Sequence, residues 1–187
     1  MLDRFDRTIS YMRISVTDRC NLRCRYCMPE EGIELLRHED ILSFDELTSF
    51  TEVAVKHGVN KVRITGGEPL VRKGIVTLVK MIAEVEGIKD LSMTTNGVLL
   101  KDFAGDLKGA GLHRVNISLD TTDPERFEYI TRGGNLNDVF EGIAAAKRAG
   151  LVPVKINCVI NKSKDEEDAR QIADFCLQNN LEIRYIH

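Results

Sequence analysis

The stretch YMRISVTDRCNLRCRYC, residues 11–27, begins as an alternation of apolar and polar residues and ends in three closely spaced cysteines. The alternation over residues 11–16 predicts a half-buried β-strand. The cysteines follow at the spacing C-x3-C-x2-C, as Cys20, Cys24 and Cys27. A strand that runs directly into a cysteine loop is the unit around which we interpret the rest of the chain.

Three thiols within eight residues predict an iron–sulfur site. A [4Fe–4S] cluster ordinarily takes four thiolates, and no fourth cysteine follows at ligand spacing. One iron would therefore stay open, as catalytic metal sites keep a position free for substrate. A zinc site is the first alternative, with His38 as the nearest fourth ligand. A disulfide framework is the second; the odd count of five cysteines and the lack of a charged-then-apolar leader disfavour it.

The same motif, with Tyr26 just before the last cysteine, resembles that of the radical S-adenosylmethionine enzymes. The resemblance implies one [4Fe–4S] cluster on Cys20, Cys24 and Cys27. It also implies that the amino and carboxylate groups of S-adenosylmethionine chelate the open iron. One electron from the reduced cluster would then break a C–S bond and release methionine and a 5′-deoxyadenosyl radical.

Composition predicts one globular domain over residues 1–187, with 29% charged and 43% hydrophobic residues. The net charge of −3 lacks the positive excess that is typical of proteins that bind nucleic acids, so we expect no nucleic-acid partner. No apolar run approaches the roughly 20 residues of a membrane span, so we expect no membrane partner. We expect a cytoplasmic protein, because thiols stay reduced in that compartment.

Six expected strands alternate with helical segments along the chain. The strands are expected at residues 11–16, 61–65, 90–94, 114–120, 153–160 and 181–186. The first helix is expected from the capping box Ser43–Glu46 to about residue 57. The second is expected to end at about residue 86, the third to end near residue 111, and the fourth to begin at Asp123-Pro124. The last two are expected over residues 137–149 and 165–179. Alternating strands and helices predict an α/β fold with parallel strands, rolled into a partial (βα)6 TIM-like barrel by right-handed crossovers.

Each expected strand carries apolar residues on one face and polar residues on the other. Parallel strands that are covered on both faces are normally apolar throughout. The pattern therefore predicts apolar faces packed on helices and a polar lumen that lines a wet cavity. An antiparallel sheet with one solvated face is the alternative, and the helix-length connections disfavour it. A six-stranded partial barrel with a polar lumen is also what the family resemblance implies.

The turn Thr65-Gly66-Gly67-Glu68-Pro69 follows the second expected strand, at the edge where α/β folds bind ligands. By itself it could be an ordinary loop. After the cysteine loop it resembles the family's Gly-Gly-Glu-Pro motif, which implies that Gly66, Gly67 and Glu68 bind the amino end of S-adenosylmethionine. The resemblance also assigns Ser118 to the methionine carboxylate or ribose and Tyr26 to the adenine. The alternatives are a locally bonded serine and a packed aromatic ring.

Three cations occupy inward positions on the expected strands: Arg13, Arg63 and Lys155. Buried cations are costly unless an anion answers them. Pairing with Asp120 and Glu182 is one explanation. The other is a polyanionic substrate such as a nucleoside triphosphate, which suits the planar fork of arginine.

Four stretches narrow the resemblance to the GTP 3′,8-cyclases of molybdenum-cofactor biosynthesis: residues 13–29, 63–70, 94–97 and 116–120. The resemblance implies that Arg13, Arg63, Thr94 and Lys155 hold GTP as substrate. The deoxyadenosyl radical would remove the C3′ hydrogen, and the sugar radical would attack C8 of guanine. An electron donor such as flavodoxin or ferredoxin is expected, and both a monomer and a homodimer stay open.

One departure from that family concerns its second [4Fe–4S] cluster, which uses three cysteines of a C-terminal region. Cys158 and Cys176 lie at no cluster spacing and are expected in the core. We therefore expect the second-cluster region to be absent, either from a truncated form or from a short homologue. Two other functions stay open: a radical enzyme that modifies a peptide or cofactor, and a cluster-binding module without turnover.

Overall fold

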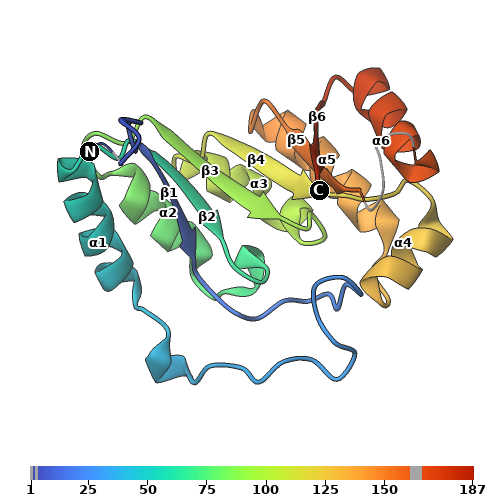
Figure 1. The fold of residues 1–187 in the computed structure, drawn as a ribbon, viewed down its shortest axis with the longest axis horizontal. Helices are drawn as coiled ribbons and strands as arrows, with labels where there is room; N and C mark the ends of the chain where they lie inside the picture. The colour runs from blue at the N-terminus through green and yellow to red at the C-terminus, as the bar shows by residue number, and fades with distance from the viewer. Residues whose placement is uncertain (1, 3, 161–165) are drawn as a thin grey trace.

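Six parallel strands form a single sheet in the computed structural model, which describes residues 2, 4–160 and 166–187. The strands follow one another in chain order across the sheet, and every neighbouring pair is parallel. Their bounds are β1 Tyr11–Ser15, β2 Lys61–Thr65, β3 Asp90–Thr95, β4 Arg114–Ser118, β5 Lys155–Val159 and β6 Glu182–Ile186. The predicted α/β fold with a parallel, partial (βα)6 barrel is confirmed (Figure 1).

Along the chain, the helices alternate with the strands, as the sequence predicts. Their bounds are α1 Phe44–Lys56, α2 Ile75–Ala83, α3 Leu100–Gly109, α4 Pro124–Thr131, α5 Leu136–Ala149 and α6 Glu167–Gln178, with short 3₁₀ turns η1 His38–Asp40 and η2 Pro69–Val71. Ser43 and Glu46 form the predicted capping box at α1, and Asp123 caps α4 ahead of Pro124. None of the helices in the described ranges is both long and apolar enough to cross a membrane.

Several element ends differ from the prediction for local reasons. The helix expected directly after β2 begins only at Ile75, because the glycine turn and η2 occupy residues 66–71. Strand β4 ends at Ser118 rather than at Asp120, whose carboxylate instead accepts a hydrogen bond from the backbone of Val159. The last helix begins at Glu167; the predicted start at residue 165 lies outside the described residues.

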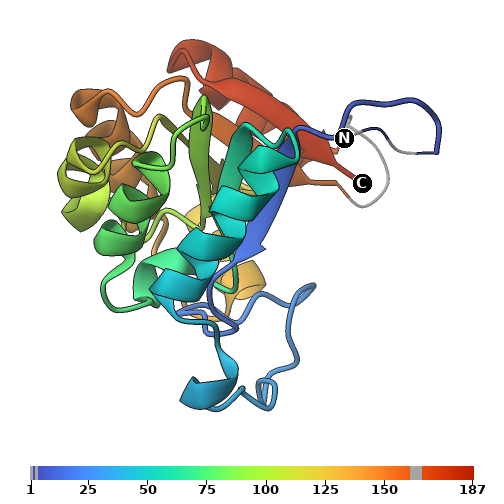
Figure 2. The ribbon, with the colours of Figure 1, turned by 90° about the vertical axis from the view of Figure 1, so that its left-hand side faces the viewer.

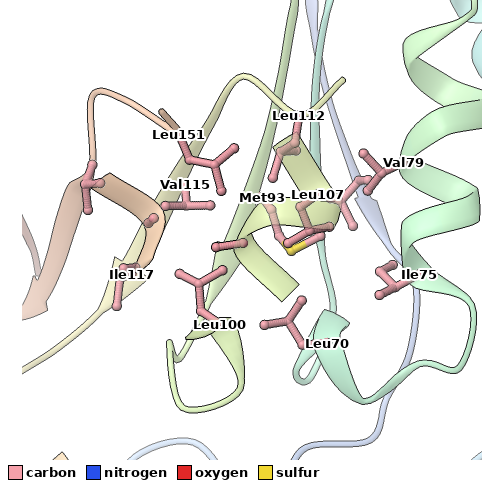
Figure 3. Close-up of a cluster of buried hydrophobic side chains, with 14 of the residues drawn as sticks. Leu70, Ile75, Val79, Met93, Leu100, Leu107, Leu112, Val115, Ile117 and Leu151 are labelled. Atoms are coloured by element: carbon pink, nitrogen blue, oxygen red, sulfur yellow. The ribbon is translucent and has the colours of Figure 1, made fainter. Parts of the chain in front are cut away.

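The hydrophobic core lies between the sheet and the helices, which gather on one side of it (Figure 2). Inward side chains of α2 and α3 meet the apolar faces of β3 and β4 (Figure 3). Met93, Ile117 and Leu107 are fully buried there. Each such side chain contributes about 1.5–3 kcal/mol of burial free energy. The predicted packing of one apolar strand face on the helices is thus observed.

The polar strand face lies on the concave side of the sheet, but its floor is not the wet surface that we expected. Ser92, Asn116 and Asn157 are 1%, 0% and 7% exposed. Arg13, which lies on the edge strand β1, stays exposed. The strand face is polar as predicted, but the expectation that it lines a wet cavity is wrong for these three residues of β3, β4 and β5, which are buried.

Candidate functional site

The cysteine loop leaves β1 and crosses the carboxyl ends of the strands toward α4 (Figure 1). Next to β1, the amide of Val16 donates to the carbonyl of Thr65 at 2.9 Å. On the far side, the amide of Arg23 donates to the carbonyl of Thr131 at 3.1 Å. The guanidinium of Arg132 donates back to the carbonyl of Arg23 at 2.8 Å. The loop is thus fixed at both ends across the mouth of the barrel.

The three loop thiols are free; Cys20 and Cys24 are partly buried and Cys27 is exposed. Burial raises the pKa of the Cys20 thiol. Burial, with the neighbouring Cys20 and Asp120, raises the pKa of the Cys24 thiol to about 11. Thiols in this environment favour the protonated form, whereas a bound metal deprotonates the thiols that coordinate it. Cys20 and Cys24 would therefore lose their protons only when a metal centre binds them.

The three thiols of the loop are compatible with an iron–sulfur cluster. Among the described residues, no three His, Cys, Asp or Glu side chains converge on one metal position. The side chain of His38, the fourth zinc ligand of our alternative, lies outside the described part of the chain. In a [4Fe–4S] cluster each thiolate holds a different iron, so the sulfurs of Cys20, Cys24 and Cys27 need not share one coordination sphere.

The glycine turn after β2 packs directly against the start of the cysteine loop. The amide of Gly67 donates to the carbonyl of Thr17 at 2.7 Å, and the amide of Glu68 donates to the carbonyl of Arg19 at 2.8 Å. A Cβ at Gly67 would lie 2.3 Å from the Arg19 oxygen, and one at Gly66 would lie 2.6 Å from the Thr17 oxygen. Glycine is therefore required for the contact between the two loops, and not only for the approach of a ligand.

Glu68 is directed into the protein rather than toward open space, with 1% exposure. Its carboxylate accepts hydrogen bonds from Leu70 N at 3.0 Å, Thr95 Oγ1 at 2.8 Å and Asn96 N at 2.7 Å. Burial raises the pKa of this carboxyl, and the three donors act in the opposite direction. Glu68 thus joins the turn after β2 to the end of β3, and its contact with a cofactor stays a prediction.

Tyr26 connects the cysteine loop to the segment that follows β4. Its hydroxyl donates to Oδ2 of Asp120 at 2.8 Å, while the amide of Val159 donates to Oδ1 at 2.8 Å. Burial raises the pKa of Asp120. The pairing of Asp120 with the lumen cations that we considered is therefore not observed. A cavity of about 280 Å³ opens beside these groups, lined by Arg25, Tyr26, Asp120, Arg126, Tyr129, Ile130, Val159, Ile160, Glu166, Asp168 and Ala169.

Two of the predicted substrate cations already have partners in the sheet. Lys155 forms an ion pair with Glu182 on β6, which is the alternative that we weighed. Arg63 lies over the ring of Tyr11, 5.3 Å from its centroid, and its Nε is 3.4 Å from the hydroxyl of Ser92. Burial lowers the pKa of Arg63, with smaller contributions from neighbouring arginines. The predicted role of Lys155 in substrate binding would therefore involve an already paired ammonium.

Arg13 differs from the other two cations. It pairs in register with Arg63 on β2, so the two guanidinium groups occupy neighbouring positions on the concave face. Within the described residues no ion pair or hydrogen bond of its side chain is found. Two adjacent arginines without a protein carboxylate between them create a positive region suited to an anion.

Polar atoms without a partner mark the floor of the same face. Oγ1 of Thr94, Nδ2 of Asn116 and Oδ1 of Asn157 are buried and have no hydrogen-bond partner among the described residues. Buried groups are rarely left in this state unless water, a ligand or an ion completes them. Thr94 was predicted from the sequence; the two asparagines were not. The signal for them was available, because both alternate inward with Ser118, which pairs in register with Asn157.

The fold and site together define an α/β partial barrel that carries a three-cysteine loop at the carboxyl ends of its strands. The model of the radical SAM superfamily matches residues 14–176, and the chain belongs to that superfamily. The family implies a [4Fe–4S] cluster and S-adenosylmethionine.

Similar curated proteins are GTP 3′,8-cyclases. The protein of Thermodesulfovibrio yellowstonii is 54% identical over 187 residues, which is 100% of this chain and 58% of that protein. The protein of Peptoclostridium acidaminophilum is 50% identical over 186 residues and is covered to 57%. The chain thus spans less than two thirds of the length of these relatives.

Solved structures resemble the chain in fold at low sequence identity. Streptococcus suis SuiB bound to precursor peptide SuiA aligns with a TM-score of 0.77 at 22% identity, over 95% of this chain and 39% of that one. Methylornithine synthase aligns with a TM-score of 0.77 at 17% identity, over 96% of this chain and 53% of that one. These likenesses support the barrel architecture.

Proposed function

We propose that this chain is the core of a GTP 3′,8-cyclase, in which Cys20, Cys24 and Cys27 hold one [4Fe–4S] cluster. The cluster, when bound with S-adenosylmethionine, supplies a 5′-deoxyadenosyl radical that takes the C3′ hydrogen of GTP, and the sugar radical closes on C8 of guanine. The observation that carries the proposal is the cysteine loop hydrogen-bonded to the Gly66–Pro69 turn. That contact puts cluster ligands and exposed glycine backbone at one edge of the barrel.

Cofactor binding follows from the arrangement of this edge. Gly67 is exposed beside the cysteine loop, where its backbone would meet the ammonium group of S-adenosylmethionine. Ser118 and Asn157 lie next to each other on β4 and β5 and offer polar atoms to the ribose and carboxylate; Oδ1 of Asn157 has no partner among the described residues. Tyr26 borders the adjoining cavity, whose apolar and charged lining suits an adenosine.

Substrate binding would use the concave face below that edge. Arg13 and Arg63 supply neighbouring guanidinium groups for phosphate oxygens. Thr94 supplies a buried hydroxyl without a protein partner. Lys155 would exchange its ion pair with Glu182 for a phosphate. The identity of the relatives, about half of all aligned positions, supports GTP as the substrate.

The proposal has three further parts: the electron donor, the oligomeric state and the location in the cell. A low-potential electron donor such as flavodoxin or ferredoxin would reduce the cluster, and a homodimer is an open alternative to a monomer. The cytoplasmic location remains a prediction.

Cys158 and Cys176 are buried in β5 and α6, and burial raises the pKa of their thiols to about 12 and about 11. Neither is suited to a second cluster.

Anaerobic reconstitution with iron and sulfide tests the proposal. We expect about four irons per chain, as one [4Fe–4S] cluster requires, and an EPR signal that shifts when S-adenosylmethionine is added. Cys24→Ala should abolish the release of 5′-deoxyadenosine. Cys176→Ala is the matched control, because it removes a thiol that lies in the core, 2% exposed.

Each result of these experiments tests a different part of the proposed function. Release of 5′-deoxyadenosine that persists in Cys24→Ala contradicts the cluster assignment, as does one tightly bound zinc without iron uptake. A count of about eight irons would require a second cluster. Release that is stimulated by GTP supports the cyclase. Release that GTP leaves unchanged, while a peptide or other cofactor stimulates it, points to a different radical enzyme.

A further inference from the structure

A polar network runs from the turn after β2, through the end of β3, to the first cluster ligand. Glu68 accepts from the backbone amide of Asn96 at 2.7 Å. The side-chain Nδ2 of Asn96 then donates to Oδ1 of Asn21 at 2.8 Å and lies 3.8 Å from Sγ of Cys20. The buried carboxylate therefore holds the residue that reaches the cysteine loop.

The orientation of the Asn96 amide is fixed by its other contacts. Its Oδ1 accepts from the amide of Val98 at 3.1 Å, so the oxygen faces its own turn. The nitrogen must then face the cysteine loop. The neighbouring Thr95 hydroxyl is also held by Glu68, at 2.8 Å. Such doubly fixed side chains keep a donor in place without further loss of conformational freedom.

Cys20 differs from the other two cysteines in the donors that it receives. Its sulfur accepts from the amide of Leu22 at 3.4 Å and from the Asn96 side chain at 3.8 Å. Within the described part of the chain, no side-chain donor reaches the sulfur of Cys24 or Cys27. Among the described residues, the one loop sulfur that accepts from a side chain thus lies on the side of the loop that packs against the glycine turn.

We propose that Asn96 is a positioning residue of the cluster site, whose amide donates to the Cys20 sulfur and favours the reduced state. The inference rests on the proposed cluster. Hydrogen bonds to ligand sulfurs are one of the factors that set the reduction potential of such clusters. The reduced state carries one more electron, supplied by a low-potential donor, so a donor hydrogen bond stabilises it more than the oxidised state.

The test replaces the amide while keeping the turn. Asn96→Asp keeps an oxygen for Val98 and exchanges the donor for a charged acceptor. Asn96→Ser keeps a hydroxyl for the turn but is too short to reach Cys20. The control, Asn135→Asp, makes the same amide-to-carboxylate change at the cap of α5, where the side chain accepts from Asn137 at 3.0 Å.

Midpoint potentials of the reconstituted proteins, measured by EPR during a dithionite titration, give the main readout. We expect Asn96→Ser to lower the equilibrium constant for one-electron reduction by roughly three- to tenfold, the range of one hydrogen bond, and Asn96→Asp to lower it further. Asn135→Asp should match the wild type. The exchangeable-proton hyperfine coupling that comes from the Asn96 amide should be lost in both Asn96 variants, while the coupling from the Leu22 amide, which also donates to Cys20, should stay.

The outcomes separate this inference from the proposed function. Wild-type potentials in both Asn96 variants, with full iron content, overturn the inference and leave the cluster assignment intact. A folded Asn96 variant that takes up no iron while Asn135→Asp loads normally supports the positioning role of Asn96. A wild-type protein that takes up no cluster contradicts the proposed function itself.

Discussion

Glu68 shows at the scale of one residue how the site is assembled. The sequence motif places this glutamate in a cofactor-binding turn, yet its side chain is 1% exposed and accepts three hydrogen bonds from the protein. A buried carboxylate is tolerated when such donors replace its hydration. Its position between the turn after β2 and the end of β3 makes it a structural link on which other site residues depend.

Glu68→Gln should therefore destabilise the fold. The substitution keeps the shape but turns one acceptor into a donor that faces Leu70 N, Thr95 Oγ1 or Asn96 N. We expect a loss of about 1–3 kcal/mol in the free energy of unfolding, the cost of an unsatisfied buried group. Urea denaturation measures it. The exposed Glu86 gives the control, since Glu86→Gln should change stability by less than about 0.5 kcal/mol.

The pH dependence of this difference checks the cause. Burial raises the pKa of Glu68, so the folded chain binds its proton more readily than the unfolded chain does. Between the ordinary and the raised pKa, the contribution of this group to the free energy of unfolding falls as pH rises. The stability difference between wild type and Glu68→Gln should thus be larger at about pH 4 than at about pH 7. A difference independent of pH would contradict the buried carboxylate as its origin.

At the scale of elements, a close backbone approach joins α5 to the turn after β3. Gly142 of α5 faces the carbonyl of Gly97, and a Cβ built on it would lie 2.3 Å from that oxygen. Gly97 has a φ of +83°, so the turn itself depends on glycine. This turn directly follows Asn96, and its height above the sheet is therefore set by how closely α5 can pack.

Gly142→Ala should force the helix and the turn apart. We expect a loss of about 1–3 kcal/mol in the free energy of unfolding, typical of overpacking. Gly105→Ala is the matched change, since Gly105 lies within α3 with nothing within 4 Å of its built Cβ. It should stabilise the fold by about 0.5–1 kcal/mol, the helix advantage of alanine. Thermal unfolding of both variants checks the pair, and equal effects would refute the close approach.

Much of the element pattern was predictable from the sequence because the signals are local. The capping box at Ser43, the Asp123-Pro124 start of α4 and the glycine after α5 fixed the ends of helices. The late start of α2 was not predictable from the sequence, because the residues before this helix form a turn that is held by contacts with the cysteine loop. Contacts distant in sequence also decide the burial of Asn116, which alternation alone marks only as polar.

The candidate site was predictable in its composition but less so in its pairings. The motif identified the cysteines and the glycine turn, which the structure brings together through Gly67 and Thr17. The pairing of Lys155 with Glu182 and of Tyr26 with Asp120 depends on strand register and loop height, neither of which the sequence specifies. Asn96 carried no separate signal, because only the folded loop places Cys20 near it.

At the scale of the whole molecule, the distribution of charge matters more than its sum. The chain has a net charge of −3, yet Arg13 and Arg63 lie side by side in register on the concave face. The sheet is open there between its edge strands β1 and β6. A polyanion can therefore be attracted to this face although the protein as a whole repels it weakly.

Arg63→Ala should weaken the binding of GTP to the reconstituted protein by about ten- to a hundredfold, as expected for the loss of one charge-assisted hydrogen bond. Isothermal titration calorimetry measures it. Arg148→Ala removes the same charge from the exposed end of α5 and should leave the affinity unchanged. Added salt should weaken GTP binding to the wild type more than to Arg63→Ala, because screening acts on the interaction that the variant lacks. Equal affinities for GTP in the two variants would remove Arg63 from the substrate site and transfer phosphate recognition to other residues of the face.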